Sequence, residues 1–228
     1  RKLCDLLEKD VYCKRDFILE GGSIHVDGQG TCMVTESCLL SKGRNPELSR
    51  EEIEGVLRAY LNVSVILWLP CGIYNDETNE HVDNICAFTA PGEVVLAWTE
   101  DQGDVQYAMS KACLDYLERA VDAKGRKIRV HKLPLPAPVT VTEEECRGLD
   151  ACFDEPARRP GERLAASYVN FYIANGSIVM PGFKDPADER AKEILQGLFP
   201  DREVVQIYTR DILIGGGNIH CITQQIPV

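Results

Sequence analysis

The chain has 228 residues, with 25 Lys and Arg against 36 Asp and Glu, so its formal net charge is −11. Hydrophobic residues make up 44% and charged residues 27%, which is typical of a folded protein and excludes wholesale disorder. The acidic balance disfavours nucleic acid, because phosphate binding needs a basic face, and no apolar run approaches the roughly 20 residues of a membrane span.

The first predicted unit occupies residues 17–69. Residues 17–19 and 23–26 are expected to be extended, residues 27–30 (Asp-Gly-Gln-Gly) to turn, and residues 31–35 to return as a strand. Ser49 and Glu52 have the spacing of a capping box before an amphipathic helix, whose apolar face includes Ile53 and Leu57. Residues 65–69 then form a short buried strand.

The same order of elements repeats twice. In the second unit a hairpin of residues 84–89 and 94–99 precedes a helix over 104–123 and a strand over 127–133. In the third, strands over 166–173 and 177–180 precede a helix that Pro186 opens and a strand over 204–208. The intervening segment 134–160 is rich in Pro, Glu and Arg and is expected to be a connector. A fourth unit is expected to begin at Gly215.

This repetition predicts an α/β propeller of pseudo-symmetric strand–strand–helix–strand units, incomplete here, with about three units plus the closing strand. The stretch Gly-Gly-Ser-Ile-His at 21–25 resembles Gly-Gly-Asn-Ile-His at 216–220, as repeats would. Such folds gather equivalent strand ends around one central channel, where sites form. We expect residues 1–228 to be a single domain.

Ten cysteines are present, but no Cys-x-x-Cys pair and only four histidines, so the spacing of a zinc ribbon is absent. Several cysteines lie in apolar stretches, as buried free thiols do, which favours a reducing cytoplasm. No signal peptide opens the chain, and no Met starts it. We expect the chain to begin inside a longer protein.

Three segments carry candidate chemistry. Gly215-Gly216-Gly217 lets the backbone approach a ligand closely and places Cys221 as a possible nucleophile. His81 and Asp83 face the same side if the chain there is extended, which suits a proton shuttle. Glu20 ends an apolar run before two glycines. Each segment alone also fits a structural role: a glycine hairpin with a buried Cys, a solvated acidic loop, a surface carboxylate.

Taken together, the three segments indicate a thiol with a histidine acid/base and carboxylate binders. Two carboxylates beside one thiol raise its pKa unless a cation joins them. A guanidinium is such a cation, and it donates two parallel N–H hydrogen bonds to a carboxylate. The segments therefore favour a guanidinium substrate.

The sequence also resembles the agmatine deiminase family of the guanidine-modifying (pentein) superfamily. The resemblance rests on LEGGSIHVDGQGT (19–31), WLPCGIYNDETNEHVDNICAF (68–88), GEVVLAWTEDQGDVQY (92–107), RLAASYVNFYIANG (163–176) and GGGNIHCITQQIP (215–227). It implies a five-bladed pentein-type α/β propeller that hydrolyses agmatine to N-carbamoylputrescine and ammonia, in putrescine and polyamine biosynthesis. The family's N-terminal guanidinium-binding Asp and nearby Trp have no match here, so the N-terminal blades are expected to be absent from this chain.

The resemblance also implies roles for individual residues. Cys221 matches the nucleophile and His81 the general acid/base, while Asp83 and Glu20 match catalytic carboxylates that also bind the guanidinium. Glu77 matches the acidic residue near the far ammonium, and Gly217 and Asn218 lie in the substrate-binding glycine segment. No metal or organic cofactor is implied. The expected partner is a small cationic substrate, and the expected assembly is a cytoplasmic homo-oligomer.

Two alternatives stay open from the sequence. A sister deiminase acting on peptidyl or free arginine needs a basic residue to read a carboxylate, for which Arg163, Lys184 and Arg210 are available. A propeller fragment without activity could instead serve as a binding module. A thiol hydrolase of amides or esters is a more distant possibility.

Overall fold

The computed structural model describes residues 2–150 and 158–226. Within them, three three-stranded sheets follow one another along the chain. Each sheet joins an antiparallel hairpin to a third strand that runs parallel to the hairpin's second strand. The strands are β1 (His25–Val26), β2 (Thr31–Thr35) and β3 (Val65–Leu69); β4 (Cys86–Ala90), β5 (Glu93–Trp98) and β6 (Arg129–Pro134); β7 (Tyr172–Ala174), β8 (Ser177–Gly182) and β9 (Glu203–Tyr208).

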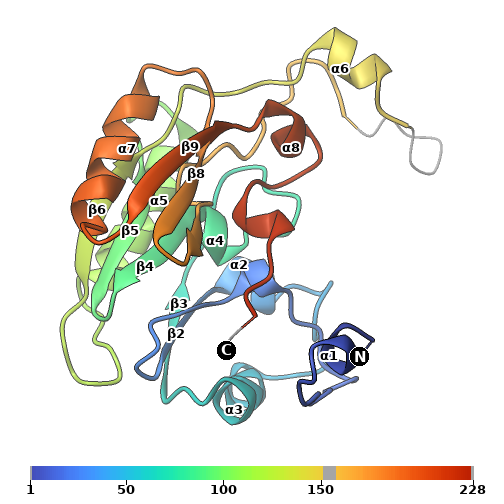
Figure 1. Cartoon of the computed structure of the whole chain (residues 1–228), viewed down its shortest axis with the longest axis vertical. Helices are drawn as coiled ribbons and strands as arrows, with labels where there is room; N and C mark the ends of the chain where they lie inside the picture. Colours follow the sequence, from blue (N-terminus) through green and yellow to red (C-terminus); the bar gives the residue numbers. More distant parts are fainter. Residues whose placement is uncertain (1, 151–157, 227–228) are drawn as a thin grey trace.

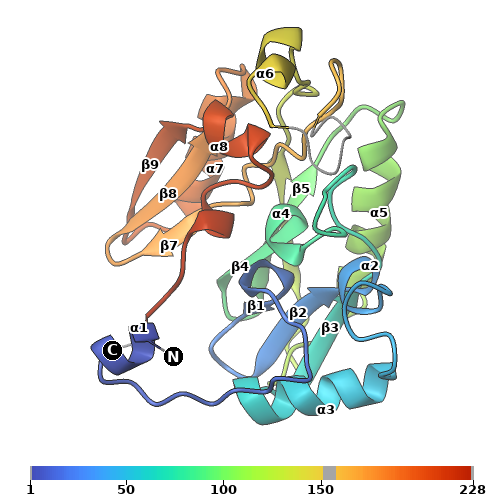
Figure 2. The same ribbon diagram turned by 90° about the vertical axis from the view of Figure 1, so that its right-hand side faces the viewer.

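One longer helix connects the parallel strands of each sheet. These helices are α3 (Arg50–Leu61), α5 (Val105–Leu117) and α7 (Ala187–Leu198). Figure 1 shows α3 below the first sheet and α7 beside the third, and Figure 2 shows α5 on the outer side of the second sheet. The three predicted strand–strand–helix–strand units are therefore confirmed.

Local sequence explains where α3 begins and ends. The Ser49 side chain accepts from the Glu52 backbone N–H, and the Glu52 side chain accepts from the Ser49 backbone N–H, which completes the predicted capping box. The helix ends at Asn62, whose φ of 54° is left-handed. Ile53 and Leu57 are fully buried against the first sheet.

A shared core joins the units. The largest apolar cluster runs through the second and third sheets and takes in Met33, Leu67 and Leu69 from the first. The backbone N–H of Trp68 donates to the Tyr116 hydroxyl over 3.0 Å, which ties β3 to α5. The units therefore pack as one body with short segments between them.

Those short segments meet near the middle of the molecule. The 3₁₀ turn η1 (Gly21–Ser23) precedes the first hairpin, the one-turn helix α4 (Val82–Ile85) precedes the second, and the 3₁₀ turn η2 (His220–Ile222) follows the third unit. Both α4 and η2 contact η1. Figure 2 shows α4 between the sheets, with the C-terminal segment returning beside them. The remaining helices are α1 (Lys2–Leu6), α2 (Glu36–Leu39), α6 (Glu143–Arg147) and α8 (Arg210–Ile214).

Several predicted boundaries were wrong. Residues 17–19 form no strand, and residues 21–23 form η1. The predicted helix over 104–123 ends at Leu117, where the N–H groups of Arg119 and Ala120 donate to carbonyls three residues back. A turn follows at Asp122, which accepts from the backbone N–H groups of Lys124 and Arg126. The connector 134–160 contains α6 and the end of β6, and its residues 151–157 lie outside the described residues.

Three errors concern the centre of the molecule. Residues 82–85 are helical, not extended: the Cys86 N–H donates back to the Val82 carbonyl, and the Asn84 side chain donates to Asp76 over 2.8 Å. The strand predicted over 166–173 begins at Tyr172, and residues 166–171 are buried without joining a sheet. The closing strand expected from Gly215 is a loop and the turn η2 in the described part.

Two further expectations can be checked. No helix among the described residues is long and apolar enough to cross a membrane. The cysteines of the described ranges are free thiols, while Cys152 lies outside the described residues. That residues 1–228 form one domain, part of a five-bladed propeller whose N-terminal blades are absent from this chain, stays a prediction.

Candidate active site

A cavity of about 750 Å³ opens where η1, the start of β7 and the C-terminal segment meet. Glu20 and His81 line one flank, His220 and Cys221 line the other, and His25 also lines the cavity. Asp83 lies behind this wall and is 1% exposed. The structure thus brings together the four residues that the sequence assigned to catalysis.

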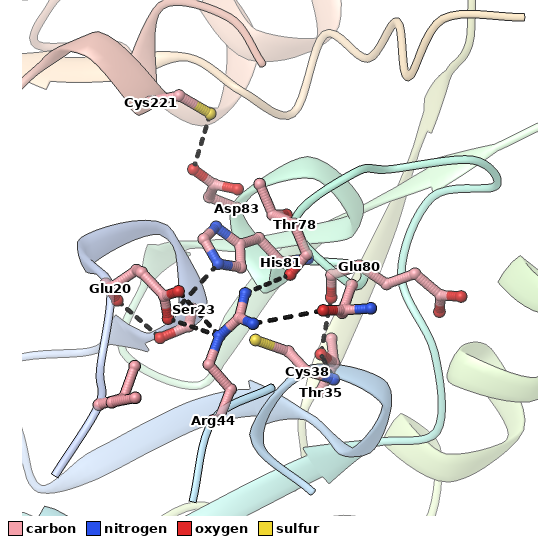
Figure 3. A network of polar contacts seen from close by, with 12 residues as sticks. Glu20, Ser23, Thr35, Cys38, Arg44, Thr78, Glu80, His81, Asp83 and Cys221 are labelled. Atoms are coloured by element: carbon pink, nitrogen blue, oxygen red, sulfur yellow. Dashed lines mark hydrogen bonds and ion pairs between the residues drawn. The ribbon is translucent and has the colours of Figure 1, made fainter. Parts of the chain in front are cut away.

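The first flank is an ion-paired network. The Arg44 Nε donates to the Glu20 carboxylate, 2.8 Å from Oε1 and 3.0 Å from Oε2. The same guanidinium donates to the Thr78 carbonyl over 2.8 Å and to the Asn79 side chain over 3.3 Å. Figure 3 shows Arg44 between Glu20 and the loop that leads to His81. Arg44 therefore fixes Glu20 relative to His81, whose Nε2 is 3.8 Å from Glu20 Oε2.

The loop before His81 is held in a strained conformation. Asn75, Asn79 and Glu80 all have left-handed φ values, between 61° and 65°. Such values cost of order 1–3 kcal/mol each and persist only where the surroundings enforce them. Here Glu80 Oε2 accepts from the Gly72 N–H over 2.7 Å, and the Glu80 carbonyl accepts from the Thr35 hydroxyl over 2.7 Å. The loop is therefore fixed from both sides.

The second flank centres on Asp83. Its Oδ2 lies 2.8 Å from His220 Nδ1 and accepts from the Cys221 thiol over 3.4 Å (Figure 3). Its Oδ1 is buried and has no hydrogen-bond partner among the described residues. A buried carboxylate oxygen without a donor is costly, so this atom points to a ligand that donates N–H.

Cys221 lines the cavity on the side of Asp83. Asn170 Nδ2 donates to its sulfur over 3.2 Å, and Asn170 Oδ1 accepts from the backbone N–H groups of His220 and Cys221. Although the residue as a whole is exposed, desolvation of the sulfur and the charge of Asp83 raise the thiol pKa to about 12. Hydrogen bonds from the Asn218 N–H and from Asn170 act in the opposite direction. The free site therefore disfavours the thiolate.

At the centre of the site, Gly22 and Gly217 allow neighbouring side chains to lie close to the backbone. A Cβ at Gly22 would lie 2.6 Å from Asp83 Oδ2 and 2.7 Å from His81 Nδ1, so both side chains border the space above Gly22. Gly217 has a φ of 100°, and a Cβ there would lie 2.8 Å from Cys221 Sγ. His81 and Asp83 therefore meet, but around a helical turn and not along a strand.

The remaining predicted residues lie at the edge. Asn218 is fully buried, and its Oδ1 accepts from the neighbouring Ile219 N–H. Glu77 is half exposed and forms an ion pair with Arg158, whose guanidinium also donates to the Ile214 carbonyl. A Cβ at Gly216 would lie 3.0 Å from Glu77 Oε2. Glu77 therefore borders the glycine segment, but the described cavity lining does not include it.

Sequence reasoning missed four polar residues of the site: Asn170, His220, Arg44 and His25. A signal existed for Asn170, because it is a polar residue within an apolar stretch that proved to be buried. Burial lowers the pKa of His25 to about 4, so its ring is neutral, and its Nδ1 accepts from the Phe88 N–H. Nothing local marks Arg44, since it belongs to a polar loop.

One group of side chains has the composition of a metal site. Ligand atoms of Glu20, Cys38 and His81 lie within 4.8 Å of one another. The Arg44 guanidinium already pairs with Glu20 there, and a second cation would be repelled. The surroundings of this group therefore disfavour a metal.

Comparison with known proteins gives consistent results. Residues 1–227 match the model of a family described as Porphyromonas-type peptidyl-arginine deiminase. An agmatine deiminase of Ectopseudomonas mendocina is 56% identical over 227 residues, which are 100% of this chain and 62% of that protein. The solved agmatine deiminase of Enterococcus faecalis is 46% identical, with a TM-score of 0.94 over 99% of this chain and 62% of its own.

A more distant solved structure adds a ligand-bound case. It is a Cys-to-Ser variant of the C. jejuni agmatine deiminase with substrate bound, 27% identical, with a TM-score of 0.81 over 96% of this chain and 59% of its own. These likenesses confirm the predicted fold class, a partial pentein-type α/β propeller. The chain spans about 62% of the length of the curated relatives that it matches.

Proposed function

The chain belongs to the Porphyromonas-type peptidyl-arginine deiminase family, and we propose that the protein hydrolyses agmatine to N-carbamoylputrescine and ammonia. One observation carries this proposal. Asp83 is buried beside the Cys221 thiol, and its Oδ1 has no donor among the described residues. A planar guanidinium supplies both the N–H donor and the positive charge that this pair needs.

The charge of the substrate explains how the thiol becomes reactive. In the free site, desolvation and Asp83 raise the pKa of Cys221 to about 12, so little thiolate exists near neutral pH. A bound guanidinium offsets the charge of Asp83 and stabilises the thiolate. The nucleophile is therefore formed where its substrate lies, and ordinary thiol reagents find it mostly protonated.

The reaction then proceeds in two halves. The Cys221 thiol gives its proton to His81, and its sulfur attacks the guanidinium carbon. His81 passes that proton to the departing nitrogen, which leaves as ammonia while the C–S bond remains. His81 then takes a proton from water, the water oxygen bonds to the same carbon, and the C–S bond breaks while the proton left on that oxygen passes to the sulfur, which returns the thiol and the ureido product. Asp83 and Glu20 hold the guanidinium in position, which is catalysis by orientation.

Glu20 is placed beside His81, which carries the proton taken from water in the second half of the reaction. His81 Nε2 is buried 3.8 Å from Glu20 Oε2, close enough for the carboxylate to stabilise an imidazolium. Arg44 keeps Glu20 in that place. Glu77 is proposed to lie near the far ammonium of agmatine, and Gly217 and Asn218 to form the backbone wall beside the reacting carbon.

A second candidate is a deiminase of free or peptidyl arginine, as the family description suggests. Such an enzyme needs a cation for the substrate carboxylate. Among the described residues that line the cavity, none is Lys or Arg. Arg163 instead pairs with Asp104 over 2.7 Å, Arg210 pairs with Glu145 over 2.6 Å, and Lys184 lies over the Tyr208 ring. These pairings favour agmatine, which has no carboxylate.

The test is formation of ureido product from agmatine and from arginine at matched concentrations. Product from agmatine alone supports the proposal, and product from arginine alone overturns the substrate while keeping the chemistry. If neither yields product and a thiol-directed amidine probe leaves Cys221 unlabelled, the protein is a binding module.

We also propose that the protein is cytoplasmic, forms a homo-oligomer and takes part in polyamine biosynthesis. The proposed reaction needs no metal or organic cofactor.

A further inference from the structure

A second pair of thiols lies at the base of the loop that leads to His81. Cys71 follows β3 and is half-buried, and Cys113 lies on α5 and is fully buried. Their sulfur atoms are 3.8 Å apart. The proposed deiminase chemistry uses neither of them.

The two thiols are aligned by their own hydrogen bonds. The Cys113 thiol donates to the Cys71 carbonyl over 3.3 Å, and the Cys71 thiol donates to the Met109 carbonyl over 3.4 Å. A disulfide brings two sulfur atoms to about 2.0 Å. The pair therefore needs a closing movement smaller than the length of one side chain.

The surroundings assign different roles to the two sulfurs. The Cys113 proton also lies beside the Cys71 sulfur, 3.8 Å from sulfur to sulfur, and this shared hydrogen bond lowers the pKa of Cys71; the same contact and burial raise the pKa of Cys113. The thiolate is the form that reacts with oxidants, and access decides which thiol reacts first. Cys71 meets both conditions, and Cys113 is the neighbour that can displace its oxidised product.

We propose that Cys71 and Cys113 are an oxidation site that closes to a disulfide on exposure to a peroxide. The Cys71 sulfur attacks one peroxide oxygen, the O–O bond breaks, and a sulfenic acid and a water molecule result. The Cys113 sulfur then attacks the Cys71 sulfur, the S–O bond breaks, and a second water leaves. In total two thiols and hydrogen peroxide give one disulfide and two waters.

The position of this pair gives the modification a structural consequence. The Gly72 N–H, next to Cys71, holds the Glu80 carboxylate over 2.7 Å, and Gln106 of α5 accepts from the Tyr74 N–H over 2.7 Å. A disulfide would join α5 covalently to the start of the strained loop. We expect backbone hydrogen exchange across residues 72–81 to slow on oxidation.

The experiment maps the bond directly. Purified, reduced protein is treated with hydrogen peroxide, quenched with N-ethylmaleimide, and digested without reductant for mass spectrometry. Trypsin alone leaves Cys71 and Cys86 in one peptide, because no Lys or Arg lies between residues 58 and 111, so a glutamate-specific protease that cuts after Glu77 is added. The expected product is a peptide that links Cys71 to Cys113 and disappears with dithiothreitol.

Variants separate this proposal from general oxidation. Cys71→Ser and Cys113→Ala should each abolish the linked peptide and the slowing of exchange. Cys146→Ser removes another half-buried thiol and should leave both unchanged. A peptide linking Cys86 to Cys113, or Cys71 recovered as unlinked sulfinic acid, would overturn the proposal. The mapping does not depend on deiminase activity, so its failure would leave the proposed function untouched.

Discussion

The two flanks of the site hold their carboxylates in opposite ways. Glu20 pairs with a guanidinium of the protein itself, at 2.8 Å from Arg44. Asp83 instead faces the thiol of Cys221 and the ring of His220 and keeps one oxygen without a donor among the described residues. Glu20 already has a cationic partner, while Asp83 has none for its second oxygen among the described residues, and this difference supports the proposal that the charge of the substrate acts at Asp83 and Cys221.

The largest effect is expected from removing the nucleophile. Cys221→Ala should lower the rate of ureido-product formation from agmatine by more than about 10³-fold, because no C–S bond can form. Agmatine binding, measured by calorimetry, should persist because Asp83 and Glu20 remain. Cys146→Ser serves as the thiol control and should keep full turnover. Substantial turnover by Cys221→Ala would refute the nucleophile assignment.

Substitutions of the adjacent residues Gly21 and Gly22 test whether catalysis needs His81 and Asp83 in their observed positions. Gly22→Ala places a methyl group 2.6 Å from Asp83 and 2.7 Å from His81, and it should lower kcat/KM by roughly 10²-fold, as displacements of about 1 Å do. The matched control is Gly21→Ala, since a Cβ at Gly21 meets no atom within 4 Å. Equal kcat/KM for the two variants, with similar thermal unfolding, would contradict the geometry described for the site.

The ion-paired flank can be broken at Arg44. Arg44→Gln releases Glu20, so we expect kcat for agmatine to fall by about tenfold while KM changes less. Arg44→Lys, which keeps one charge beside Glu20, should recover part of the loss. Arg190→Gln, which removes an exposed pair with Glu193, is the control, because such surface pairs contribute about 0–1 kcal/mol. A loss of stability without a change in kcat would assign Arg44 a structural role alone.

The smallest effect is expected from a test of how Asp83 changes the pKa of Cys221 in the second flank. Asp83 contributes to raising the pKa of Cys221 to about 12, so Asp83→Asn should lower that pKa. At a fixed pH below 12 more thiolate is then present, and alkylation of Cys221 by iodoacetamide should become faster even though agmatine turnover falls. Peptide-level mass spectrometry measures the rate, with Asp115→Asn as control, because Asp115 is half-buried on α5 and pairs with Lys111. Slower alkylation in Asp83→Asn would show that Asp83 does not oppose the thiolate.

Much of the fold could be read from local patterns. Ser49 and Glu52 predicted a capping box that the structure contains, and the hairpin turns with their following helices gave the three units in order. These features depend on residues within a few positions of one another, so composition and period are enough to predict them. Where a buried segment belongs to no sheet, as in residues 166–171, the same patterns predicted a strand that does not form.

The candidate site likewise contains residues that could be selected from the sequence and residues that only the structure revealed. Cys221, His81, Asp83 and Glu20 could be selected from the sequence, because each stands beside glycines or enters an apolar segment, and because the segments resemble one family. The partners Arg44 and His220 could not, since they act on residues that are 24 and 137 positions away. Asn170 was marked as a polar residue in an apolar stretch, but its partner Cys221 is 51 positions away. The alternation argument for His81 and Asp83 was wrong, yet the two side chains meet, because α4 turns them around Gly22.

The sequence by itself determined the repeated units and the family, and it selected the side chains proposed to react. Only the tertiary structure decided how these side chains are charged and held. It placed Arg44 on one carboxylate and left the other facing a thiol. The physical reason is that pKa values and hydrogen-bond partners depend on distances between atoms, and those distances are set by packing between units that are far apart in the chain.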